Sequence, residues 1–185
     1  MEKAIKEVRL TEVRALEEEN QDMIIEGYAV VFDSPATHYG YTEIVDRNAF
    51  NGCDMSDVCL KYNHEDTFLI LARTRNNSLQ LTIDDKGLKI RANLLDTTQN
   101  RDIYKMIQAK LLDKMSFAFT VSVEDYNYET DTRTIKTIDK LFDVSVVDVP
   151  FYDTTEVFAR SKEDYLKQKE QLELEKEKTK MLLSL

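Results

Sequence analysis

Apolar and polar residues alternate along most of this chain, and this period of two is the feature that most constrains its fold. The clearest case is the pair of segments 79–83 and 88–94, where both arms alternate and Asp84-Asp85-Lys86-Gly87 has the composition of a tight turn. A period of two places successive side chains on opposite faces of a sheet. The two segments therefore predict a β-hairpin.

The same alternation predicts further short strands on both sides of this hairpin. They cover residues 4–16, 22–32, 43–45, 57–63, 68–75, 114–124, 133–138 and 140–149, and the first two form an antiparallel pair. We expect a bulge at Gly27 and a loop over 33–42. One core helix is predicted, capped by Thr97 or Thr98 and continuing to about Leu112 at helical spacing. Many short strands and few helices predict a mainly β protein, an antiparallel barrel or sandwich.

The end of the chain differs from the rest in composition. Residues 161–185 hold six Lys, six acidic residues and no Gly or Pro, and Glu163 stands four residues before Lys167. This pattern predicts a helix, but its middle lacks the apolar heptads of a coiled coil. We therefore expect one domain over 1–160, a size that can bury a single core, followed by a charged helical tail over 161–185.

The charge and hydropathy of the chain exclude two classes of partner. The formal net charge of -10 belongs to residues 1–160, because the charges of the tail cancel. An acidic surface repels phosphate groups, so we expect no direct binding to nucleic acid. No apolar run approaches the ~20 residues of a membrane span, and the N-terminus lacks the apolar region of a signal peptide. We expect a cytosolic protein with no membrane partner.

The two cysteines, Cys53 and Cys59, are expected to be free thiols in a reducing compartment. A zinc site that also used His64 and His38 is the weaker alternative. Its C-x5-C-x4-H spacing is not one of the common structural zinc spacings. We expect no metal ion.

The segment 114–124 carries the best candidate nucleophile. Its apolar side chains share one face, and the other face carries the small residues Ser116, Ala118, Thr120 and Ser122. This pattern leaves room beside the Ser116 hydroxyl and predicts that Ser116 is accessible to a substrate. The same pattern also fits polar residues that simply line the wet face of an antiparallel sheet.

A hydroxyl nucleophile needs a base that titrates near neutrality, and His64 is the better placed of the two histidines. A third group should orient the imidazole, and the last predicted strand offers Asp143 and Asp148. These two acids are an odd number of residues apart, so in a regular strand their side chains point to opposite faces of the sheet. Without a bulge only one of them can face the site. We favour Asp143 because it shares its face with the small Ser145.

Several short segments occur in a characteristic order. They are Glu26–Phe32, Glu43–Val45, Ala49–Phe50, Asn63–Glu65, Leu71–Thr74, Asp84–Leu88, Met115–Phe119 and Phe142–Tyr152. In this order and spacing the chain resembles, over about residues 8–160, the prohead protease family of tailed bacteriophages, the HK97-type serine peptidases. It departs from the family pattern at Arg47-Asn48, where Pro-Gly is common, at Lys114, where Gly is frequent, and at Asp143, where Glu is frequent.

The resemblance implies a closed or partly open β-barrel similar to herpesvirus assemblin. It also implies a serine endopeptidase with Ser116 as nucleophile, His64 as base and Asp143 as the orienting acid, without a cofactor. Such an enzyme would cleave scaffold protein or the scaffold-like arm of the major capsid protein, and itself, inside the assembling prohead in the host cytoplasm. Apart from the resemblance, the change of composition at residue 161 predicts that the tail recruits the protease into the shell or is trimmed by it. Homo-oligomerisation is left open. The alternative is a non-enzymatic capsid-assembly scaffold or chaperone on the same fold.

Overall fold

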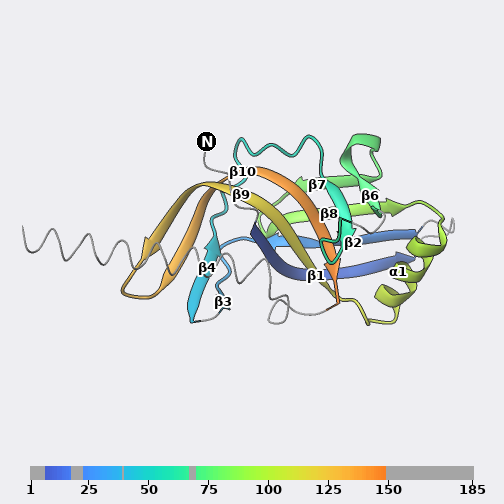
Figure 1. Ribbon diagram of the computed structural model, residues 1–185, viewed down its shortest axis with the longest axis horizontal. Helices are drawn as coiled ribbons and strands as arrows, with labels where there is room; N and C mark the ends of the chain where they lie inside the picture. The colour runs from blue at the N-terminus through green and yellow to red at the C-terminus, as the bar shows by residue number, and fades with distance from the viewer. Residues whose placement is uncertain (1–6, 18–22, 39, 67–69, 149–185) are drawn as a thin grey trace, which may run out of the picture. The chain divides into compact units, whose positions relative to one another are not determined.

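The computed structural model describes residues 7–17, 23–38, 40–66 and 70–148 (Figure 1). These residues form a mainly β protein with one α-helix, which confirms the predicted class. The strands are β1 (Glu7–Glu17), β2 (Met23–Val31), β3 (Ala36–His38), β4 (Tyr41–Val45), β5 (Cys59–Tyr62), β6 (Ala72–Arg73), β7 (Leu79–Ile83), β8 (Gly87–Leu94), β9 (Lys114–Asn127) and β10 (Thr132–Val147). The helices are the 3-10 turn η1 (Thr74–Asn76) and α1 (Thr98–Gln108). The boundary at residue 160 and the tail 161–185 lie outside the described residues, and so both remain predictions.

The described strands form one sheet. Its path runs β3-β4-β10-β9-β1-β2-β8-β7, and β5 and β6 branch from β10. Strand β1 joins the two halves, because residues 7–12 pair with β9 and residues 13–17 pair with β2. The ends of this path, β3 and β7, do not pair with each other among the described strands, so these strands do not close into a barrel. The similarity to herpesvirus assemblin remains a prediction.

Strand β10 is the central element for the site. One edge pairs antiparallel with β9, and the other pairs parallel with β4 over Thr132–Ile135 and then with β5 over Asp143–Val146. Figure 1 shows β9 and β10 as a long, curved pair. The sequence predicted two strands here, 133–138 and 140–149. Register shifts between Ile135 and Asp143 instead let one continuous strand bend, since bulges increase local twist without ending the pairing.

The predicted hairpins are confirmed as β1 with β2 and β7 with β8. The prediction of a bulge at Gly27 is wrong, because Gly27 pairs with β8 in register. The register shift in this pair of strands lies slightly later, between Tyr28 and Val30. At this irregularity the backbones of β2 and β8 approach each other closely. A Cβ added to Gly87 would lie 1.9 Å from the Val30 carbonyl oxygen, so only glycine fits at this position of β8.

Two other predicted boundaries shift. The segment 33–42, expected to be a loop, contains β3 and the start of β4, which pair around Gly40 with its positive φ of 92°. Helix α1 begins after Thr97, whose hydroxyl accepts a hydrogen bond from the Asn100 N–H at 3.1 Å. It ends at Gln108 rather than Leu112, because Lys110 takes a left-handed φ of 57°.

The hydrophobic core contains buried side chains of β9, β10 and β5 together with residues of β2, β8 and α1. Phe117 and Phe119 stack with ring centroids 4.5 Å apart, and Leu60 and Val144 are buried with them. The period of two in β9 therefore separates the faces as predicted, since Phe117 and Phe119 face the core. Ser116 and Ala118 lie on the opposite face. None of the described helices is long and apolar enough to span a membrane.

Candidate active site

His64 lies in a tight turn directly after β5, and its ring contacts Asp143 of β10. The Nδ1 atom of His64 is 2.5 Å from Oδ1 of Asp143. Asp143 is fully buried, and the His64 side chain is 14% exposed. When Nδ1 carries the hydrogen and donates it to the carboxylate, the Nε2 lone pair remains available to accept a proton. This is the arrangement of a general base with its orienting acid.

Ser145 connects the two members of this pair. Its hydroxyl donates to Asp143 Oδ1 at 3.1 Å, accepts a hydrogen bond from the His64 backbone N–H at 3.2 Å and lies 3.2 Å from His64 Nδ1. Ser145 and Asp143 are two residues apart on β10, so they share a face of the sheet. The serine therefore ties both the backbone and the ring of His64 to the strand that carries the acid.

Lys61 supplies positive charge beside the buried carboxylate. Its Nζ lies 3.8 Å from Asp143 Oδ2 and 2.5 Å from Asp66 Oδ1, and its side chain is 14% exposed. Burial lowers the pKa of Lys61, but the Asp66 hydrogen bond and the charge of Asp143 outweigh this effect, so the pKa is raised. A nearby cation offsets part of the cost of burying the Asp143 charge.

Ser116 lies on the neighbouring strand, directly opposite Ser145 in the β9–β10 register. Side chains of opposed residues project from the same face, with Cβ atoms about 4.5–5.5 Å apart. Ser116 therefore stands beside the serine that contacts His64. The predicted accessibility is wrong, because Ser116 is 1% exposed. Alternation distinguishes the two faces of a strand, but it carries no information on whether other parts of the protein cover the second face.

Two atoms of this group have unsatisfied hydrogen-bonding capacity. Among buried side-chain atoms of the described residues, His64 Nε2, Ser116 Oγ and Asn100 Oδ1 have no hydrogen-bond partner. Leaving such a group unpaired costs about 1–3 kcal/mol, so unpaired groups are uncommon in folded proteins. Two of the three are the atoms between which a serine–histidine mechanism transfers a proton.

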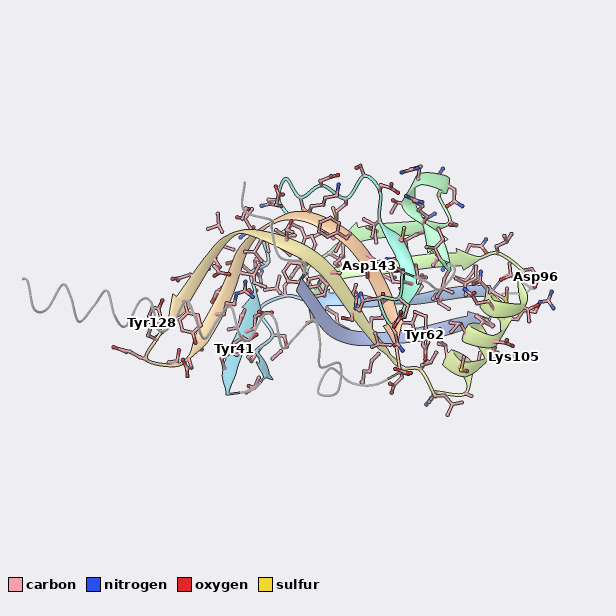
Figure 2. The ribbon with its side chains drawn as sticks, viewed as in Figure 1. Tyr41, Tyr62, Asp96, Lys105, Tyr128 and Asp143 are labelled. Carbon is pink, nitrogen blue, oxygen red and sulfur yellow. The ribbon has the colours of Figure 1, made fainter. Side chains whose placement is uncertain are left out.

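Asp148, the other candidate for the orienting acid, makes different contacts. It is exposed just beyond β10. Its carboxylate accepts hydrogen bonds from Tyr62 Oη at 2.7 Å and from Asn63 Nδ2 at 2.9 Å. Burial, together with the bond to Asp148, raises the pKa of Tyr62 to about 12. Asp143 and Tyr62 are labelled in Figure 2, which places Tyr62 near the C-terminal end of β10. The structure thus brings Asp143, and not Asp148, to the imidazole.

The cysteines do not join this group as a metal centre. Within the part of the chain that the structure describes, no three side chains of the metal-ligating types gather closely enough to hold an ion. Cys53 and Cys59 are free and partly buried. Burial raises the pKa of Cys53 to about 11, so its thiol stays protonated near neutrality.

Sequence reasoning missed the parts played by Ser145 and Lys61. For Ser145 a signal was present, because its spacing from Asp143 places it on the same face of a strand. For Lys61 there was no usable signal. Its place depends on the parallel pairing of β5 with β10, which sets Lys61 opposite Ser145, and parallel partners far apart in sequence leave no local pattern.

Comparison with known proteins identifies one family. A family described as caudovirus prohead serine protease matches residues 9–169 of the 185, a span that includes Ser116, His64 and Asp143. No curated protein and no solved structure matches the chain.

Proposed function

The chain belongs to the caudovirus prohead serine protease family, whose members are proteases of capsid maturation, and we propose that Ser116, His64 and Asp143 form its catalytic site. One observation carries this proposal. His64 is held through Nδ1 by Asp143 at 2.5 Å, while its Nε2 and the Ser116 hydroxyl on the adjacent strand are both buried without a partner. A base with an oriented ring and a hydroxyl with no competing bond are what nucleophilic catalysis needs.

The proposed reaction is acyl transfer. Ser116 Oγ attacks the peptide carbonyl carbon while His64 Nε2 takes the hydroxyl proton, and Asp143 stabilises the imidazolium that forms. His64 then donates this proton to the leaving amine, which breaks the C–N bond and leaves an acyl-enzyme. Water attacks the ester with His64 again as the base, and the second product leaves with Ser116 regenerated. Because Ser116 is 1% exposed, the atoms that cover it must move before a peptide can bind.

The proposed substrates are scaffold protein or the scaffold-like arm of the major capsid protein, together with the protease itself. Cleavage would take place inside the assembling prohead in the host cytoplasm. The family supports this part of the proposal, because its members are described as prohead serine proteases.

A coexpression experiment tests the proposal. The major capsid protein is produced with the wild type, with Ser116→Ala or with Ser122→Ala, and its mass is measured after assembly. Ser122 lies on the same strand but is exposed, so it is a matched control. We expect Ser116→Ala to lower turnover by ~10^6, which abolishes visible cleavage, because the residues act as a unit. Unimpaired cleavage by Ser116→Ala would refute the assignment.

A second measurement separates the enzyme from a non-enzymatic scaffold or chaperone. A fluorophosphonate reacts with a serine hydroxyl only when a neighbouring base activates it. We expect it to label the wild type at Ser116 and to leave Ser116→Ala unlabelled. If neither the label nor a shortened capsid protein appears with the wild type, the chain is an assembly protein without protease activity.

The charged segment 161–185, which lies outside the described residues, also has a proposed function. Its abrupt change of composition supports a segment that recruits the protease into the shell or is removed from it by self-cleavage. Deletion of 161–185 should then lower the amount of protease in particles or remove a mass difference seen with the wild type. Normal incorporation with an unchanged mass pattern would contradict both functions.

A further inference from the structure

The turn that carries His64 has an unusual backbone. Asn63 and His64 are adjacent residues with left-handed φ angles of 51° and 57°, and the Glu65 N–H donates to the Tyr62 carbonyl at 3.0 Å. Two successive positive φ values closed by such a bond are typical of a type I′ turn, in which glycine and asparagine predominate. Histidine is strained there, because its Cβ approaches its own backbone. Strain of this kind persists only when the surroundings hold the turn in place.

Asp148 forms a clamp on this turn. Its backbone N–H donates to Asn63 Oδ1 at 3.1 Å, and Asn63 Nδ2 donates back to Asp148 Oδ1 at 2.9 Å. Its other carboxylate oxygen accepts a hydrogen bond from Tyr62 Oη at 2.7 Å. The clamp thus joins the end of β10 to the two residues that directly precede His64.

We infer that Asp148 is a positioning residue for the proposed reaction, acting through Asn63 and Tyr62 to keep the imidazole of His64 against Asp143. This inference rests on the proposed function of Ser116 and His64. Besides the clamp, the turn is held by the Asn63 N–H bond to the Val146 carbonyl at 3.0 Å and by the His64 N–H bond to Ser145 Oγ at 3.2 Å. Loss of the clamp removes the side-chain part of this support, so the left-handed φ angles relax in part and Nδ1 moves away from the Asp143 carboxylate. The two acids considered for the site, Asp143 on β10 and Asp148 just beyond it, then have separate tasks. Asp143 orients the ring, and Asp148 holds the backbone that presents it.

The rate of fluorophosphonate labelling at Ser116 measures this effect without a known peptide substrate. We expect Asp148→Ala to lower the maximal labelling rate by roughly 10- to 100-fold, the cost of a displacement near 1 Å. The reagent concentration that gives half-maximal rate should stay unchanged, since Asp148 does not touch the reagent. Asp148→Asn should recover most of the rate, because the new amide oxygen can still accept from Asn63 Nδ2. Asp139→Ala, at an exposed position on β10, is the matched control.

A second variant keeps the inference testable if Asp148→Ala fails to fold. Asn63→Gly accepts a positive φ without strain but removes both side-chain bonds to Asp148. If the clamp positions His64, this variant should also label slowly. If it labels at the wild-type rate, the clamp is not needed for positioning, and the inference is overturned.

Proton NMR reports ring position without any reaction. A His64 Nδ1–H held by a carboxylate gives a far-downfield resonance, and His38→Gln assigns it because the chain has only two histidines. We expect this signal in the wild type and in Asp139→Ala, and its loss in Asp148→Ala. An unchanged signal and labelling rate in Asp148→Ala would overturn the inference but leave the proposed function intact. Failure of the wild type to label at Ser116 would instead overturn the proposed function and the inference with it.

Discussion

Ser116 and Ser145 face each other across β9 and β10, yet their hydroxyl groups have opposite energetic effects. The Ser145 hydroxyl bonds to Asp143 and to the His64 backbone, whereas the Ser116 hydroxyl is buried with no partner. A buried polar group stabilises a fold when it is paired and destabilises it when it is not. A proposed nucleophile is therefore held at some cost to stability.

Alanine substitutions of Ser116 and Ser145 should separate the effect of an unpaired hydroxyl on stability from that of a paired one. We expect Ser145→Ala to lower the free energy of unfolding by about 1–3 kcal/mol, because the His64 N–H loses its acceptor and Asp143 loses a donor. Ser116→Ala should be neutral or stabilising, because it removes an unpaired hydroxyl. Urea denaturation of the two variants against the wild type measures both values. A loss at Ser116→Ala as large as that at Ser145→Ala would show that the Ser116 hydroxyl is paired in solution.

The sequence indicated which residues carry the proposed chemistry, but it said much less about the residues that surround and position them. Ser116, His64 and Asp143 could be chosen from strand parity, the scarcity of histidine and a family resemblance. The burial of Ser116 and the contact of Lys61 with Asp143 could not be predicted. The burial of Ser116 and the Lys61 contact depend on segments that meet only after folding. The alternation of side chains describes only one strand at a time.

The N-cap of helix α1 allows a direct test of the preference for threonine at this position. Thr97 and Thr98 are adjacent and both are common capping residues, but only Thr97 accepts the hydrogen bond from Asn100 N–H. We expect Thr97→Ala to cost about 0.5–2 kcal/mol in the free energy of unfolding, since it leaves a helix N–H unpaired. Thr98→Ala, at an exposed position inside the first turn, should cost far less. Equal costs in thermal or urea unfolding would contradict the assignment of the cap.

The strands were predicted best where the pattern is local and worst where long-range pairing sets them. The hairpin β7–β8 has both arms and its turn within one short segment, and it was predicted nearly to its ends. Strand β10 was predicted as two pieces, because its bulges disturb the alternation while pairing with β9 continues. The short β3 was missed, since three residues are too few to show a period.

Across the described part of the chain, two partly buried groups with raised pKa values, the Cys53 thiol and the Tyr62 phenol, should limit stability in alkali. Burial raises the pKa of Cys53 from 9.0 to about 11 and, with Asp148, that of Tyr62 from 10.0 to about 12. The unfolded chain therefore releases these protons at lower pH than the native protein. The stability from Cys53 is complete below pH 9 and is lost as pH rises to about 11. Tyr62 adds a second loss between pH 10 and about 12.

Unfolding at two pH values tests this expectation. The wild-type free energy of unfolding should fall between pH 8 and pH 10.5, because the thiol of the unfolded chain ionises in this interval while that of the native chain stays mostly protonated. Cys53→Ala should show a smaller fall over the same interval, whatever its stability at pH 8. An identical fall in both proteins would show that Cys53 does not contribute.

Strand β10 is the last described strand, so the proposed site can assemble only after the ribosome has made it. This strand supplies Asp143, which lies 79 residues after His64, and it pairs with β9, β4 and β5. A ribosome adds about 5–20 residues per second, and domains fold as units during or after this process. A nascent or truncated chain that stops before residue 143 carries the serine and the histidine but lacks the strand that unites them. Translation must therefore pass β10 before the proposed site can assemble, so a chain that stops earlier should lack the proposed protease activity.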